Sequence, residues 1–279
     1  METETKSSVQ SIDRALSIIE ILSTNNGLSI KALSEKTSLH KSTVYRLLQT
    51  LRMHNYVYQD SRTEQYFLGA KILELSANLM SNLDIRSVAR PVLEKLCIET
   101  KQTVHLCILD GTDAVYIDKL ENEHQAIRMY SQIGKHIPAY CSSAGKALVA
   151  WSEEEVRNRV ISSINFFTRT KHTIINKEDY LRELAAVLRK GYAVDWCEHE
   201  ENIWCVAAPV FDREQRVIAA ISVSAGVWSL NAEQFVNMCE KTSWAAKTVS
   251  KYMGCRNSPA TFSLDEADIR RIQLNNQAT

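Results

Sequence analysis

The sequence predicts an α+β protein with two domains, a small helical one near the N-terminus and a larger one in which helices flank an antiparallel sheet. Three observations support this prediction. Apolar residues between positions 29 and 51 recur at spacings of three, four and seven, which is typical of helices that share a core. Alternating runs separated by turn residues begin near position 104. A chain of 279 residues with 45% hydrophobic content is long enough for two cores.

The N-terminal domain is expected to begin with a helix over residues 9–23. Its apolar side chains should be buried, and they are Ile12, Leu16, Ile19 and Leu22. A helix, a tight turn and a second helix follow over about residues 29–51. No acidic residue lies between Thr37 and Gln59, and an exposed helix without carboxylates suits a polyanion. The side chains expected to reach a DNA major groove are Lys41, Ser42, Thr43, Tyr45 and Arg46.

A short hairpin after the second helix strengthens this interpretation. Two aromatic strands, residues 56–59 and 65–68, flank a polar turn at residues 60–64. Such a wing lies beside the DNA backbone, where Arg62 at its tip is suited to contact a phosphate. We therefore expect a winged helix-turn-helix domain over residues 8–70, with double-stranded DNA as its partner. The alternative is an ordinary solvated helix face in an unrelated three-helix unit.

The next segment, residues 71–84, is expected to form a stiff connector helix because it contains neither proline nor glycine. Its apolar residues form a stripe that could join another chain, and they are Ile72, Leu75, Leu79 and Leu83.

The larger domain is predicted over residues 85–254. It should open with a helix over residues 88–100 that has Pro91 in its first turn, and a hairpin should follow, with strands 104–109 and 114–120. A third strand is expected over residues 126–131. Capping pairs predict three further helices, at Ser152/Glu155, at Asn176/Asp179 and at Asn231/Gln234. The second of these should end at Gly191 and the third near residue 253. Strands 203–211 and 217–224 should pair, and residues 255–279 should form a polar, frayed tail.

Composition excludes several classes of protein. The formal net charge is zero, so affinity for nucleic acid must come from a local patch. No apolar run approaches the roughly 20 residues that span a bilayer, and the start Met1–Lys6 lacks a signal-peptide core. We expect a cytoplasmic protein without membrane contact. Seven cysteines, an odd number without framework spacing, are expected to be reduced thiols.

Residues 140–148 form a run of small side chains that leads into a helix. Backbone N–H groups at such a helix start can bind an anion, although the spacing of a P-loop is absent. The alternative is a close helix–sheet contact that requires small residues. Ser222 and Ser224 lie two apart in an apolar strand, so both hydroxyls share one face and need a partner from the backbone or from a ligand. His105 could be a satisfied core histidine or part of a pocket.

Two further chemistries are weakly supported. Cys205, His199 and Asp195 contain the residue types of a nucleophilic triad, but Cys205 lies in mid-strand rather than on an exposed elbow. Cys197, His199 and Cys205 could bind zinc, but a second paired-cysteine motif is missing. We expect no catalytic residues, no metal and no cofactor.

Five motifs in this order resemble the IclR family of transcriptional regulators over nearly the whole chain. They are Lys41-Ser-Thr-Val-Tyr-Arg-Leu-Leu, Ser143-Ala-Gly-Lys, Gly191-Tyr-Ala-Val-Asp195, Cys205-Val-Ala-Ala-Pro-Val and Ile221-Ser-Val-Ser. The first motif and Arg128-Met-Tyr-Ser-Gln-Ile-Gly most resemble the KdgR-type branch, which responds to sugar-acid breakdown products such as 2-keto-3-deoxygluconate.

The resemblance implies a GAF/profilin-like C-terminal domain with an effector pocket, in a dimer or dimer of dimers. The family's pocket positions fall on Ser143, Ala144, Asp195, Cys205, Ser222 and Ser224, and we add His105, Arg128 and Tyr140 as candidate wall residues. The implied function is a regulator, expected to be a repressor of a catabolic operon, that a small carboxylic acid such as a sugar-derived keto acid controls. The alternatives are a cysteine-dependent enzyme with an accessory DNA-binding module and a structural adaptor.

The chain departs from the family pattern near Asp195. Members commonly have Glu-Glu after the aspartate motif and a glycine before the cysteine, whereas this chain has Cys197-Glu198 and Asn202. Because asparagine tolerates a positive φ better than most residues, we expect the turn to survive.

Overall fold

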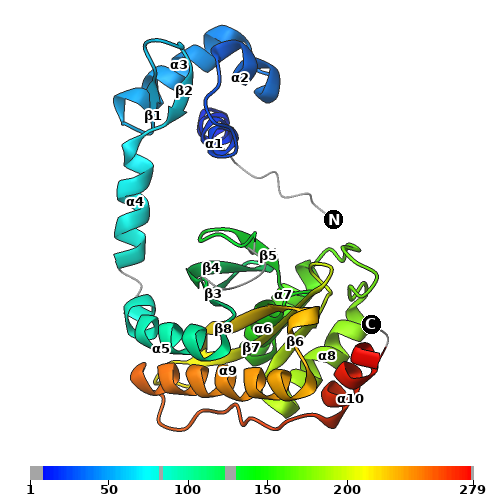
Figure 1. The fold of residues 1–279 in the computed structure, drawn as a ribbon. Coiled ribbons are helices and arrows are strands. Elements are labelled where there is room, and N and C mark those ends of the chain that lie inside the picture. The colour runs from blue at the N-terminus through cyan, green and yellow to red at the C-terminus, as the bar shows by residue number, and fades with distance from the viewer. Residues whose placement is uncertain (1–8, 82–83, 123–129, 278–279) are drawn as a thin grey trace. The chain divides into compact units, whose positions relative to one another are not determined.

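The computed structural model describes residues 9–81, 84–122 and 130–277, and the chain divides into two units, residues 1–83 and 84–279 (Figure 1). The smaller unit contains α1 (Gln10–Ser23), α2 (Ile30–Thr37), α3 (Lys41–Met53), β1 (Val57–Gln59), β2 (Tyr66–Leu68) and α4 (Ala70–Ser81). Its core is formed by Ile18, Leu22, Leu33, Val44, Leu48, Leu51, Val57 and Tyr66. The helix-turn-helix and the antiparallel wing are therefore both present.

The apolar face of α1 differs from the prediction. Ile12 and Leu16 are not buried but 56% and 51% exposed, while Ile18 and Leu22 enter the core. The helix carries apolar side chains on two sides, and the unit covers only one of them. Ile12 and Leu16 instead border a groove between α1 and α3.

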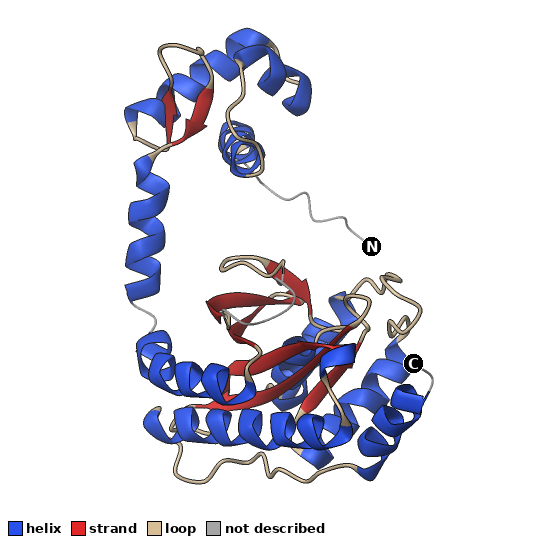
Figure 2. Ribbon diagram, in the orientation of Figure 1, coloured by secondary structure: helices blue, strands red, loops and turns tan. Residues whose placement is uncertain are grey.

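The larger unit is built on one six-stranded antiparallel sheet with the order β5-β4-β3-β8-β7-β6 (Figure 2). Its strands are β3 (Thr103–Asp110), β4 (Asp113–Leu120), β5 (His136–Pro138), β6 (Ala193–Trp196), β7 (Ile203–Phe211) and β8 (Val217–Gly226). Both predicted hairpins, β3–β4 and β7–β8, are confirmed. Residues 126–129 of the expected third strand lie outside the described residues, and Ser131 is not in a strand.

Helices cover both faces of the sheet. The helices α5 (Asp84–Thr100) and α9 (Ala232–Tyr252) pack on one face, and α6 (Ser143–Trp151), with α8 (Lys177–Lys190) behind it, packs on the other (Figure 1). The short α7 (Glu154–Ser163) follows α6, and a 3-10 turn η1 (Val227–Ser229) precedes α9. Among the described residues, no helix combines the length and the apolar character that a bilayer span requires.

Two predicted capping pairs are confirmed and one is wrong. Asn176 caps α8 through the Asp179 N–H, and Asn231 forms a capping box with Gln234 at the start of α9. Ser152, by contrast, ends α6, and its hydroxyl donates to the carbonyl of Leu148 at 2.8 Å. The following helix α7 starts without a side-chain cap. Helix α5 begins at Asp84, four residues before the predicted start, so Pro91 lies inside it.

The C-terminal segment contains a docked helix rather than a frayed tail. Helix α10 (Glu266–Gln277) carries the fully buried Ile272. Asp268 accepts hydrogen bonds from Lys190 Nζ at 2.9 Å and from the Tyr192 hydroxyl at 2.8 Å. Arg271 lies over the Trp196 ring, 4.8 Å from its centroid. These partners precede α10 by 70 residues or more, so local polarity could not reveal them.

Candidate functional site

Helix α3 presents a polar face on a rigid base. Ser38 has a left-handed φ of 56° and turns the chain between α2 and α3. His40 then caps α3, because its Nδ1 lies 3.4 Å from the Ser42 N–H and 2.8 Å from the Ser42 hydroxyl. The buried Val44 and Leu48 fix the opposite side of the helix in the core.

The predicted DNA-facing residues are mostly accessible. Lys41, Ser42, Tyr45 and Arg46 are exposed. Thr43 is half-buried at the groove between α1 and α3, which Arg46 also borders. The exposed part of α3 therefore offers hydroxyl groups and three cations, Lys41, Arg46 and Arg52, and α3 contains no carboxylate.

The wing holds Arg62 outward. Asp60 accepts hydrogen bonds from the backbone N–H groups of Arg62 and Thr63 at 2.8 and 2.9 Å, which closes the turn and lowers the pKa of Asp60. The Arg62 side chain is 89% exposed, and its guanidinium lies 3.9 Å from Asp60.

A cavity of about 60 Å³ lies in the larger unit beside the start of α6. All six positions that the family resemblance indicates line it, namely Ser143 and Ala144 from α6, Asp195 from β6, Cys205 from β7, and Ser222 and Ser224 from β8. His105 from β3 lines it as well. With Tyr116 from β4 and Ile137 from β5, all six strands and α6 contribute residues to this single hollow.

The start of α6 supplies backbone donors. Ser142 caps the helix by accepting from the Gly145 N–H at 3.2 Å, and its hydroxyl donates to the Pro138 carbonyl at 2.8 Å. The first N–H groups of a helix have no acceptor within it, and here they belong to Ser143 and Ala144, which border the cavity. The partial positive charge at this end attracts an anion. A Cβ on Gly145 would overlap Ala139, so α6 also makes a close backbone contact here, with the segment after β5 rather than with a strand.

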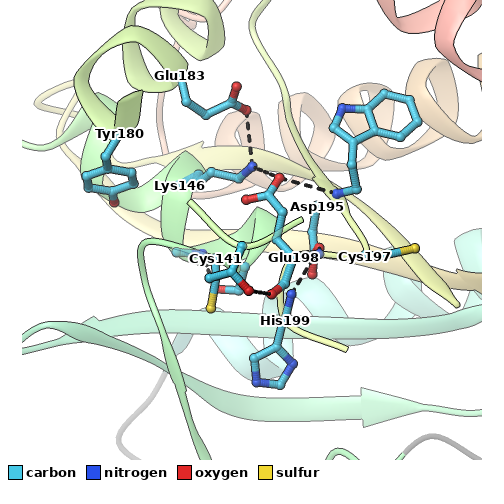
Figure 3. Close-up of polar contacts among 12 residues, drawn as sticks. Cys141, Lys146, Tyr180, Glu183, Asp195, Cys197, Glu198 and His199 are labelled. Carbon is cyan, nitrogen blue, oxygen red and sulfur yellow. Dashed lines mark hydrogen bonds and ion pairs between the residues drawn. The ribbon is translucent and has the colours of Figure 1, made fainter. Parts of the chain in front are cut away.

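Asp195 is held by the turn that follows β6. Its Oδ1 accepts from the Glu198 N–H at 2.6 Å and from the His199 N–H at 3.4 Å (Figure 3). Burial, and then the neighbouring Glu198 carboxylate, raise the pKa of Asp195 well above its usual value. This shift favours the protonated form of the carboxyl group, which can donate as well as accept a hydrogen bond.

Lys146 stands behind this turn as a fully buried cation. Its Nζ lies 2.7 Å from Glu198 Oε1 and 3.1 Å from Glu183 Oε1 (Figure 3). Burial would lower the pKa of Lys146, but the two carboxylates raise it above the usual value. The ion cluster anchors the turn against α6 and α8. Within the turn, Cys197 and Asn202 have φ values of 59° and 63°, as expected for Asn202.

Cys205 does not have the environment of a nucleophile. Its Sγ lies 3.0 Å from the Ser224 hydroxyl, and burial, together with Asp195, raises the pKa of the thiol well above its usual value. A catalytic cysteine requires the opposite shift. In the described part of the chain, no group of three His, Cys, Asp or Glu side chains has the arrangement of a metal site. The triad and zinc hypotheses therefore gain no support from the geometry.

One candidate wall residue does not line the cavity. The prediction that Tyr140 lies in the cavity wall is wrong. Its hydroxyl donates to the Phe167 carbonyl at 2.8 Å, and the residue borders a different hollow. Arg128 lies outside the described residues. The sequence interpretation missed lining residues that come from β4 and from loops, namely Tyr116, Tyr130, Ser131, Lys135, His199 and Glu200. Only Tyr116 had a local signal, since it alternates with buried residues on a predicted strand.

Comparison with known proteins agrees with this architecture. Residues 11–61 match the IclR helix-turn-helix domain, and residues 77–251 match the family described as bacterial transcriptional regulator IclR C-terminal. The chain is 36% identical to the HTH-type transcriptional regulator XynR of Escherichia coli over 247 residues, which cover 88% of this chain and 98% of that protein. It is also 36% identical to KdgR of Dickeya chrysanthemi over 255 residues, 90% and 82% of the two chains. The crystal structure of the Thermotoga maritima IclR superposes with a TM-score of 0.74 at 28% identity, covering 88% and 99%.

Proposed function

Because this chain belongs to the IclR family of bacterial transcriptional regulators, we propose that it binds operator DNA through α3 and the wing and that a small carboxylic acid in the cavity controls this binding. One observation carries the proposal. The six residues indicated by the family motifs, separated by up to 81 positions, border one hollow that contains a helix N-terminus and several hydroxyl groups. Members of this family are regulators rather than enzymes.

The DNA-binding part of the proposal depends on charge and exposure. Lys41 and Arg46 lie on the exposed face of α3, and Arg62 projects from the wing. Ser42, Thr43, Tyr45 and Arg46 are assigned to bases or phosphates in the major groove, and Arg62 to the adjacent backbone. The affinity should fall with added salt, because bound cations are released when lysine and arginine neutralise phosphates.

The effector part depends on complementary donors. A ligand carboxylate would accept from the N–H groups of Ser143 and Ala144, with the Lys135 ammonium at the cavity lining. Its remaining oxygens would meet the carboxyl group of Asp195, whose raised pKa favours the protonated, donating form, and the Cys205 and Ser224 groups. This chemistry suits a short keto or hydroxy acid of the sugar-derived kind that the motif resemblance implies. We propose repression of a catabolic operon as the outcome.

The chain is also proposed to act as a dimer or a dimer of dimers. Val9, just before α1, is 60% exposed, Ile12 and Leu16 on α1 are 56% and 51% exposed, and Leu73 on α4 is 77% exposed. Exposed apolar side chains that lie close together often mark a surface that a second chain covers. A symmetric pair of recognition helices would then meet two half-sites of an operator.

The proposal can be tested by selecting DNA from a random duplex pool with the full-length protein and measuring the selected duplex by fluorescence anisotropy. We expect a steep decrease of affinity between 50 and 200 mM salt and a change of affinity when sugar-derived keto and hydroxy acids are added. Failure to enrich any duplex would contradict the DNA-binding proposal. Enriched DNA whose affinity no acid alters would contradict the effector proposal alone.

A further inference from the structure

The cavity contains two buried polar groups for which the described residues provide no hydrogen-bond partner, namely the Nδ1 atom of His105 and the hydroxyl group of Ser222. His105 is 1% exposed and Ser222 is 3% exposed, and both line the cavity. They lie directly opposite each other on the paired strands β3 and β8, so both side chains point to the same face of the sheet. A buried polar group without a hydrogen bond costs free energy, which a bound ligand can recover.

The imidazole of His105 is fixed on one side only. Its Nε2 lies 2.8 Å from the Ser131 hydroxyl, and its ring packs against Tyr116 with the centroids 4.7 Å apart. Its Nδ1 is one of five buried side-chain polar atoms in the described residues that lack a hydrogen bond. The other four belong to Asp118, Trp151, Glu198 and Ser243, none of which lines this cavity.

The two cavity serines differ in whether their hydroxyl groups have a hydrogen-bond partner. The Ser224 hydroxyl pairs with Cys205 Sγ at 3.0 Å. No hydrogen bond of the described residues involves the Ser222 hydroxyl. The unsatisfied pair is therefore His105 and Ser222, which are neighbours across the strand ladder, whereas the helix N-terminus that suits a carboxylate belongs to α6.

We propose that His105 and Ser222 together form a subsite for a hydroxyl group of the effector, so that His105 makes the cavity selective for hydroxylated carboxylic acids. This inference rests on the proposed effector function and specifies its ligand. A hydroxyl group fits the pair because it donates one hydrogen bond and accepts another.

The choice of a hydroxyl over a carbonyl follows from the tautomers of His105. Burial, with a smaller effect of Lys119, lowers the pKa of His105 to about 3, so the ring is neutral near pH 7. If the Ser131 hydroxyl donates to Nε2, then Nδ1–H is a donor; if Nε2–H donates to Ser131, then Nδ1 is an acceptor. A ligand hydroxyl satisfies either tautomer, whereas a carbonyl oxygen satisfies only the first.

The test uses five acids with one carbon skeleton: butanoate, 2-oxobutanoate, and 2-, 3- and 4-hydroxybutanoate. Their dissociation constants are measured for the full-length protein by ligand-observed NMR titration at pH 7. We expect at least one hydroxybutanoate to bind the native protein tenfold or more tightly than butanoate and than 2-oxobutanoate. The position of the favoured hydroxyl reports its distance from the carboxylate.

Variants then assign the preference to the subsite. His105→Phe keeps the ring shape without nitrogen, and Ser222→Ala removes the hydroxyl. Each should reduce the ratio of hydroxybutanoate affinity to butanoate affinity to less than twofold. His105→Asn places a polar atom near Nδ1 and should retain part of the preference, whereas His105→Gln replaces Nε2 and should not. Ser162→Ala, at an exposed site on α7, is the matched control, and the unfolding temperature of each ligand-free variant verifies its fold.

Three results would overturn the inference. Equal binding of all five acids by the native protein would exclude a hydroxyl subsite while leaving the proposed effector cavity intact. A preference that persists in His105→Phe would exclude His105 as its source. Absence of binding by all five acids would reject both the subsite and the carboxylate cavity, without affecting the proposed DNA binding.

Discussion

The ammonium group of Lys146 lies 2.7 Å from Oε1 of Glu198, and neither side chain is more than 5% exposed. The same Oε1 lies 3.3 Å from the Trp196 N–H, and the Glu198 N–H donates to Asp195. A buried ion pair thus connects the interior of α6 to the turn that places Asp195 at the cavity. Removing one ion from such a pair leaves the other uncompensated.

We expect Lys146→Met to be strongly destabilising. Glu198 and Glu183 would lose their shared cation inside the protein, and the free energy of unfolding should decrease by about 3–5 kcal/mol. Urea denaturation at pH 7 measures this change. Lys177→Met, at an exposed position of α8, is the control and should change stability by less than about 0.5 kcal/mol. Equal effects of the two substitutions would show that the buried pair does not stabilise the fold.

The pH dependence of the free energy of unfolding should show the lowered pKa of His105. Burial lowers its pKa in the folded protein to about 3 from a usual 6.5, so below pH 6.5 the unfolded chain binds a proton that the folded chain does not. The stability contributed by the neutral imidazole is complete above pH 6.5 and is lost as the pH falls toward 3. This loss approaches about 1.4 kcal/mol per pH unit, and His105→Phe should lack it. Urea denaturation of both proteins at pH 7, 6 and 5 tests the difference, and parallel pH profiles would contradict the assignment.

Arg46→Ala should weaken operator binding. Arg46 projects from the exposed face of α3, and loss of one base or phosphate contact should cost about 1–3 kcal/mol, roughly a tenfold to hundredfold increase in dissociation constant. Fluorescence anisotropy on the selected duplex measures it. Arg159→Ala removes the same charge from an exposed site on α7 and should leave the affinity unchanged. Unchanged binding by Arg46→Ala, with an intact circular dichroism spectrum, would reject α3 as the recognition helix.

Gly145→Ala should disturb the anion-facing end of α6. The added Cβ would overlap backbone atoms of Ala139, so the helix start must move, and the expected cost is about 1–3 kcal/mol. Gly226→Ala is a suitable comparison, since the three atoms nearest to its Cβ would all belong to the side chain of Trp228, which is 60% exposed. Thermal unfolding of both variants is the measurement. The prediction fails if Gly145→Ala unfolds at the temperature of the native protein.

Asp268→Ala should release α10. Lys190 and Tyr192 would both lose their buried acceptor, and we expect a loss of about 3 kcal/mol together with faster proteolytic cleavage after residue 255. Glu266→Ala, in the first turn of the same helix, controls for helix propensity. If the two variants resist protease equally, the buried contact does not hold the helix.

The sequence predicted those features that depend on neighbouring residues. Asn176 and Asn231 cap helices through N–H groups three positions away, so their role is visible locally. Ser152 has the same spacing to a glutamate, yet its hydroxyl bonds backward to Leu148 because α6 ends there. The strands of the two hairpins and the winged helix-turn-helix were likewise predicted from local patterns.

Features that depend on distant contacts were missed. Tyr140 was assigned to the cavity, but its hydroxyl bonds Phe167, 27 positions away. The docking of α10 requires Lys190, 78 positions before Asp268. The buried cation Lys146 belongs to a recognised motif, but nothing near it in the sequence indicated Glu183 and Glu198 as its partners. For the cavity itself, the family motifs succeeded where periodicity could not, since they combine residues from four separate elements.

All seven cysteines are free, and burial raises the pKa of each thiol. At neutral pH, maleimide reagents should therefore react slowly with the native protein. A cysteine introduced by Ser61→Cys at the exposed wing tip would be the preferred attachment point for a spin label or a dye. In the proposed dimer, distances between two such labels would report whether the wings separate or approach when DNA or an acid is added, with all native cysteines left in place.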